Sequence, residues 1–125
     1  MAAFQFINKI FLRGVVGVST IRQFGGKNHI AFSLLHEHSY MDENGLMTVD
    51  CTWVHVSAFE GGTVSMQEMQ KVCKGAKVEV IGRLRTSRYV NSDGSTAVHL
   101  EVVAHRLHVM DDDNPESIFP EVEDK

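Results

Sequence analysis

The sequence gathers cationic side chains next to an aromatic ring between residues 83 and 89. Arg83, Arg85 and Arg88 precede Tyr89, and Gly82 interrupts the apolar run in front of them. Cations beside an exposed ring suit a single nucleic-acid strand, because the cations bind phosphates while the ring stacks on any base. A solvated basic strand face that ends in a tyrosine would account for the same residues. The pattern alone leaves both interpretations open.

The elements that must position this cluster are mostly strands. Apolar alternation predicts five of them, over residues 4–16, 29–40, 46–59, 76–90 and 96–110. Residues 42–45 (DENG) and 91–94 (NSDG) are typical hairpin turns, because their glycines tolerate positive φ. The polar, glycine-bearing residues 19–28 predict a loop or a ragged hairpin. Gly82, inside the fourth strand, predicts a bend that would help a small barrel to close.

One short helix is expected between the third and fourth strands. Ser65 and Glu68 have capping-box spacing, and Gly75 stands where a helix commonly ends. Helical spacing relates Met66, Met69, Val72 and Cys73. Five strands interrupted by one such helix of about two to three turns is the element order of an OB-fold barrel. We therefore expect an all-β, five-stranded OB-fold domain over residues 1–110.

The charge is distributed unevenly along the chain. The net charge is −4, yet residues 111–125 contain seven acidic residues against one lysine, so the first 110 residues are slightly basic. Acidic segments with few large apolar residues are usually solvated. The sequence therefore predicts an acidic, flexible tail over residues 111–125.

Composition narrows the class of protein. The 125 residues suit one domain, and no apolar run approaches the roughly 20 residues that span a bilayer. The first residues lack the pattern of a secretory signal. Cys51 and Cys73 are too few for a disulfide framework and are interpreted as reduced thiols. These features predict a cytoplasmic protein that does not enter membranes.

The seven histidines do not form a pattern that indicates catalysis or metal binding. His36 and His38 would share a strand face, but a closed zinc site needs four ligands and no Cys or carboxylate is spaced to complete it. No serine has the context of a nucleophile elbow, and no glycine motif would cradle a phosphate. We therefore expect no enzyme activity, no metal and no cofactor.

Four segments occur in the order and spacing of a known family. They are residues 8–14 (NKIFLRG), 51–59 (CTWVHVSAF), 74–86 (KGAKVEVIGRLRT) and 91–94 (NSDG). Over residues 8–110 the chain resembles bacterial-type single-stranded DNA-binding proteins. The resemblance implies sequence-independent binding of single-stranded DNA in replication, recombination or repair, near the nucleoid. It also implies a homo-oligomer, a tetramer or otherwise a dimer, although Val54 replaces the histidine that the family carries near its subunit contacts.

The resemblance also implies roles for particular side chains. The base-stacking positions of the family fall on Tyr40, Trp53, Phe59 and Tyr89, each of which could instead be a packing or loop residue. Phosphates would be bound by Arg13, Arg22, Lys27, Arg83, Arg85 and Arg88. A hook for replication or repair proteins would use Asp111, Asp112, Asp113, Ile118 and Phe119, although here the chain continues past the Phe-Pro pair.

Two alternatives remain open at the level of sequence. The first is an OB-fold protein-interaction module whose acidic tail binds partners and whose barrel hardly binds DNA. The second is an RNA-binding OB domain, because stacking and phosphate contacts serve either nucleic acid.

Overall fold

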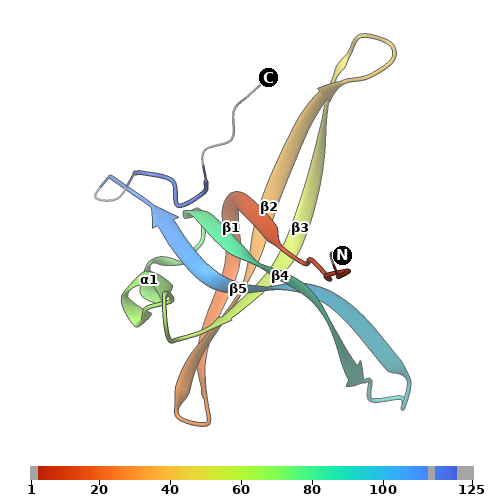
Figure 1. Cartoon of the computed structure of the whole chain (residues 1–125). Helices are drawn as coiled ribbons and strands as arrows, with labels where there is room; N and C mark the ends of the chain where they lie inside the picture. Colours follow the sequence, from red (N-terminus) through yellow and green to blue (C-terminus); the bar gives the residue numbers. More distant parts are fainter. Residues whose placement is uncertain (1–2, 113–114, 121–125) are drawn as a thin grey trace.

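The computed structural model describes residues 3–112 and 115–120. Its elements are β1 (Ile10–Phe24), β2 (Lys27–Met41), β3 (Met47–Phe59), α1 (Met66–Lys71), β4 (Lys77–Val90) and β5 (Thr96–Met110). The strands close into one barrel in the order β1-β2-β3-β5-β4 (Figure 1). Neighbouring strands are antiparallel except β3 and β5, which are parallel. The predicted five-stranded barrel with a helix between the third and fourth strands is confirmed.

The interior of the barrel holds a single apolar core. Alternate residues of each strand point inward, and side chains such as Ile30, Leu34, Val80 and Val102 are fully buried. The α1 side chain Met69 belongs to the same cluster. Burial of aliphatic side chains of this size stabilises a fold by about 1.5–3 kcal/mol each. The core therefore fixes which face of every strand points outward.

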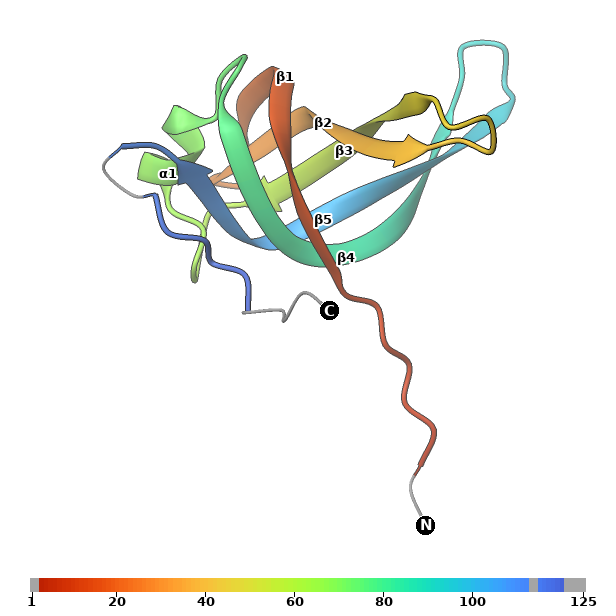
Figure 2. The same ribbon diagram turned by 90° about the horizontal axis from the view of Figure 1, so that it is seen from above.

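Three hairpin ribbons extend beyond the closed part of the barrel (Figures 1 and 2). The β2–β3 ribbon remains paired to Met41 opposite Met47, and the β4–β5 ribbon to Val90 opposite Thr96. The third ribbon joins β1 to β2, with Phe24 opposite Lys27. These ribbons present outward-facing side chains well beyond the barrel wall.

Of the two structures predicted for residues 19–28, the hairpin is correct and the loop is not. They form the end of β1, a turn at Gly25 and Gly26 with positive φ, and the start of β2. This ribbon has little buried surface, so the sequence lacks the apolar alternation that would distinguish a hairpin from a loop. At the other end, residues 4–9 lie before β1 rather than within it.

The predicted bend at Gly82 is confirmed. The β4–β5 register shifts between Ile81 and Gly82. A Cβ atom at Gly82 would lie 2.2 Å from the carbonyl oxygen of Val103, so only glycine allows β5 to approach this closely. Residues 77–82 of β4 pair with β1 as well as β5, whereas the rest of β4 pairs with β5 alone.

The helix is shorter than the sequence predicted. Ser65 caps it by accepting a hydrogen bond from the Glu68 amide at 3.1 Å, as expected. The Glu68 carboxylate does not return to Ser65, because it accepts from the amide of Val109 at 2.9 Å. The helix ends at Lys71, and Gly75 instead supplies a positive φ in the turn before β4. In the described part of the chain, no helix has the length and apolarity to cross a membrane.

Candidate nucleic-acid interface

The outer side of β3 carries two of the predicted stacking residues. Trp53 and Phe59 point outward because Val54, Val56 and Ala58 occupy the inward positions. The exposed fraction is 58% for Trp53 and 49% for Phe59. Gly17 lies under Trp53, and a Cβ atom at Gly17 would come within 2.6 Å of the indole ring. The indole therefore lies against β1 and leaves its remaining surface open to solvent.

A row of rings continues from β3 onto the β1–β2 ribbon. The His29 ring contacts Phe59 at 4.6 Å between centroids and Phe24 at 5.5 Å. Arg22 is directly opposite His29 in the ladder, and Lys27 lies two residues before it on the same face. Lys27 is directly opposite Phe24, so the predicted phosphate contacts Arg22 and Lys27 lie beside His29 and Phe24 on the β1–β2 ribbon.

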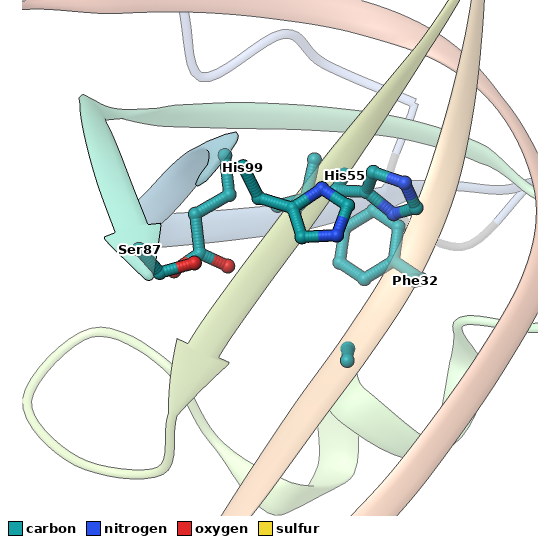
Figure 3. A pocket seen from close by; sticks show the side chains of 7 residues that line it. Phe32, His55, Ser87 and His99 are labelled. Atoms are coloured by element: carbon teal, nitrogen blue, oxygen red, sulfur yellow. The ribbon is translucent and has the colours of Figure 1, made fainter. Parts of the chain in front are cut away.

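The β4–β5 ribbon adds a second group of rings. Tyr89 stacks on His99 with a centroid distance of 4.8 Å, and His99 meets His55 of β3 at 5.8 Å. His55, His99 and Ser87 line a cavity of about 190 Å³ between β3 and this ribbon (Figure 3). Tyr89 is thereby connected to the face that carries Trp53 and Phe59. We call this continuous outer surface of β1, β2, β3 and the β4–β5 ribbon the aromatic face.

Side-chain alternation divides the arginines of β4. Arg83 and Arg85 share the outward positions of Tyr89, whereas Arg88 points to the opposite side of the ribbon. The Arg85 guanidinium forms an ion pair with Glu101 directly across the ladder, and Glu101 also lines the cavity. Arg85 therefore meets the aromatic face with part of its charge already compensated.

The charges of Arg85 and Glu101 also influence the pKa of His29 on the β1–β2 ribbon. Burial lowers the pKa of His29 below its ordinary value; the Glu101 charge opposes this shift, and the Arg85 charge adds to it. His29 is therefore biased toward the neutral form, which suits a ring packed between two phenylalanines.

Three of the predicted stacking and phosphate-binding residues lie outside the aromatic face. Tyr40 is opposite Thr48 near the tip of the β2–β3 ribbon, and alternation puts it on the other side of the ladder from Trp53. It stacks on His38 instead. Arg88 points away, as described above. Arg13 lies on β1 opposite Glu79 of β4, and the two side chains form an ion pair.

Some of the predicted tail residues contact the rest of the protein. Asp111 forms an ion pair with Lys71 of α1 at 3.5 Å, and Asp112 is exposed. Asp113 lies outside the described residues. Phe119 contacts Phe11 of β1, and the Ile118 amide donates a hydrogen bond to Glu79. The predicted flexibility of residues 111–125 stays a prediction.

Sequence reasoning missed the histidines of the aromatic face. His29, His55 and His99 link the predicted aromatic residues to one another. His55 follows Trp53 by two residues and so shares its strand face, a signal that the sequence does contain. His99 offers no such signal, because its position beside Tyr89 depends on the register of the hairpin. Across residues 3–112 and 115–120, no group of three or more histidine, cysteine or carboxylate side chains is placed to bind a metal.

Comparison with known proteins gives consistent matches. The model of the single-strand binding protein family matches residues 7–110. A Plasmodium falciparum SSB in complex with ssDNA superposes with a TM-score of 0.73 at 24% identity, covering 88% of this chain and 100% of that one. No curated protein matches the sequence.

Two bacterial structures share the same fold. A deletion mutant of the single-stranded DNA binding protein from Thermus aquaticus gives a TM-score of 0.70 at 20% identity, covering 85% of this chain but 51% of that one. The small single-stranded DNA-binding protein from Streptomyces coelicolor gives 0.64 at 18% identity, covering 84% and 96% respectively. The chain thus spans about half of the Thermus protein's length and nearly all of the other two.

Proposed function

The chain belongs to the single-strand binding protein family and binds single-stranded DNA, and we propose that the strand lies along the aromatic face. One observation carries this proposal. Trp53 and Phe59 of β3 lie on one continuous outer surface with Tyr89, which is distant from them in sequence, and this surface also carries cationic side chains.

The proposed mode of binding needs no base-specific contact. Bases stack on Trp53, Phe59 and Tyr89, and each stacked base contributes about 1–3 kcal/mol regardless of its identity. Arg22, Lys27, Arg83 and Arg85 bind phosphates along the path. Because every base has a π-face and every nucleotide a phosphate, this binding is independent of sequence.

Titration with three nucleic acids tests the proposal. We expect oligo-dT to bind more tightly than duplex DNA of equal length, because a duplex keeps its bases stacked and unavailable to the rings. Arg83→Ala should reduce the salt dependence of oligo-dT binding by about 0.7 in slope for each lost phosphate contact. Arg88→Ala is the matched control, since its side chain points to the other side of the same ribbon. Equal effects of the two variants would contradict the proposed path.

The RNA-binding alternative is addressed by the same titration. Oligo-rU bound as tightly as oligo-dT would favour a general single-strand binder. Failure of both oligonucleotides to bind at low salt would favour the protein-interaction module.

We also propose that the protein acts as a homo-oligomer, a tetramer or otherwise a dimer. Phe4, Phe6 and Ile7 are 82%, 93% and 86% exposed on an extended segment that leads away from the barrel (Figure 2). Asn8 anchors this segment by exchanging hydrogen bonds with the backbone of Leu84, at 2.7 and 2.8 Å. Leu84, Val98 and Leu100 add exposed apolar surface on the side of the β4–β5 ribbon away from Tyr89. A second copy would cover such surface.

The cellular role belongs to the same proposal. We propose non-catalytic binding of single strands in replication, recombination or repair, in the cytoplasm near the nucleoid. We propose in addition that the acidic tail contacts other replication or repair proteins.

A further inference from the structure

Residues 115–120 pass over the outer side of β1 and β4, and we call them the strap. The Ser117 hydroxyl donates to Glu79 Oε2 at 2.6 Å, and the Ile118 amide donates to Glu79 Oε1 at 3.0 Å. The ring of Phe119 meets Phe11 edge-on at 5.6 Å. These contacts join the strap to two strands that lie far from it in the sequence.

Glu79 is the centre of this contact. Glu79 occupies an outward-facing position of β4, yet the residue has no surface exposed to solvent. Arg13 Nε donates to Oε2 at 2.9 Å, so both carboxylate oxygens have donors. A buried carboxylate without such partners would carry a large desolvation penalty. The strap thus supplies two of the donors that allow the charge to be buried.

Arg13 contributes a second set of contacts. Its guanidinium lies 5.2 Å from the centroid of Phe119, and its Nη2 donates to the Ser117 hydroxyl at 3.1 Å. The hydroxyl also accepts from the Phe119 amide at 3.1 Å. Ser117 therefore uses its oxygen fully, once as donor and twice as acceptor. A side chain that only accepts could not replace it against the carboxylate.

The strap crosses over the outside of the barrel wall and leaves a cavity beneath part of its length. Pro115 and Ser117 form one side of a cavity of about 670 Å³, and Arg13, Leu35 and Lys77 belong to its other walls. The strap is therefore held mainly at its Ser117–Phe119 end, where the directed contacts are.

We infer that the outer side of β1 and β4 around Glu79 is a peptide-binding site, and that its ligand is the Ser117–Ile118–Phe119 segment of the same chain. The site recognises a serine hydroxyl, the next backbone amide and an aromatic ring two residues after the serine. An anionic residue in place of the serine, such as phosphoserine, is excluded because it would face the buried carboxylate. This site is separate from the aromatic face, and the inference does not depend on DNA binding.

Backbone amide exchange of the full chain, followed by NMR, tests the inference. In the wild type, the Ile118 amide should exchange at least about tenfold more slowly than in an unstructured peptide, as expected for a hydrogen bond to a charged group. Ser117→Ala and Ser117→Glu should remove this protection and leave the amides of β4 and β5 protected. Glu116→Gln is the matched control, because it removes a strap charge that has no hydrogen bond or ion pair among the described residues. Unprotected Ile118 in the wild type, or full protection in Ser117→Glu, would overturn the inference.

A second measurement tests whether the site accepts a ligand supplied separately. Full-length Ser117→Glu, with its own strap released, is titrated with a peptide of residues 111–125 that keeps Ser117. An effective concentration of about 1 mM for a tethered strap, with tenfold protection, corresponds to a Kd of about 0.1 mM or tighter. We expect saturable shifts at Phe11 and Glu79, and none with a phosphoserine peptide. Absence of shifts with the unmodified peptide at millimolar concentration would show that the site is not a receptor.

Discussion

At the scale of single residues, Tyr89 is the most informative side chain of the aromatic face. It is 44% exposed and stacks on His99, so its ring is oriented before any base arrives. Tyr89→Ala should weaken oligo-dT binding by about 1–3 kcal/mol and leave the fold intact. Tyr40→Ala, which changes the same side chain on the opposite side of another ribbon, should have the smaller effect. Fluorescence anisotropy of labelled oligo-dT measures both, and equal losses would contradict the assignment of Tyr89.

Some of these residue roles follow from the sequence alone and others do not. Alternation along β4 places Arg83 and Arg85 with Tyr89 and turns Arg88 away, and counting positions is enough to see it. Arg13 is different, because its partner Glu79 lies 66 residues away and only the β1–β4 register brings the two together. No local pattern reports a pairing of that kind.

Glu79 also makes the strap sensitive to acid. Burial raises the pKa of this carboxyl, but the hydrogen bonds from Ser117, Arg13 and Ile118 and the charge of Arg13 outweigh it and hold the pKa below its ordinary value of 4.5. A lowered pKa stabilises the docked strap above pH 4.5, and that stability is lost as the pH falls through the lowered pKa. The titratable or charged side chains opposite Glu79 are Arg13 on β1 and His108 on β5, and Lys77 lies two residues before it.

The Ile118 amide shift, followed against pH by NMR, measures this transition. We expect it below pH 4.5 in the wild type and no such transition in Ser117→Ala, whose strap is already released. Glu79→Gln should abolish it. A wild-type transition above pH 4.5 would contradict the lowered pKa.

At the scale of elements, the bend in β4 decides whether the barrel can close. The Cβ atom in Gly82→Ala would press on the backbone of Val103, and forcing such a group into a packed site costs about 1–3 kcal/mol. Thr86→Ala, on the same strand beyond the barrel, should cost under about 0.5 kcal/mol. Urea denaturation measures both free energies of unfolding. A Gly82→Ala protein as stable as the wild type would mean that the close approach is not required.

The sequence predicted the strands of the barrel and the two ribbons that end in clear hairpin turns, but for residues 19–28 it left a loop and a hairpin open. Ile30, Phe32 and Leu34 alternate because they face the core, and this pattern identified β2. Residues 20–24 of β1 are exposed, so no buried face selects alternate apolar residues there. The contact of the strap with the barrel could not be predicted from the sequence either, since Phe119 contacts a residue more than one hundred positions away.

At the scale of the whole molecule, the exposed N-terminal segment predicts self-association. Light scattering should give a dimer or tetramer at micromolar concentration, because Phe4, Phe6 and Ile7 leave a large apolar surface uncovered in a single copy. Replacing Phe4 and Phe6 by serine should shift the protein toward the monomer without unfolding it, since both side chains lie outside the core. A wild-type protein that remains monomeric would refute the proposed assembly.

The central claim is that a single DNA strand lies on the aromatic face, and the fluorescence of Trp53 tests it most directly. Trp53 is the only tryptophan of the chain, and its indole is 58% exposed on that face. Stacking of a base on the indole should quench its emission, so oligo-dT at low salt should produce saturable quenching whose midpoint agrees with the Kd from anisotropy. Oligo-dT that binds by anisotropy while the emission of Trp53 stays unchanged would contradict the account.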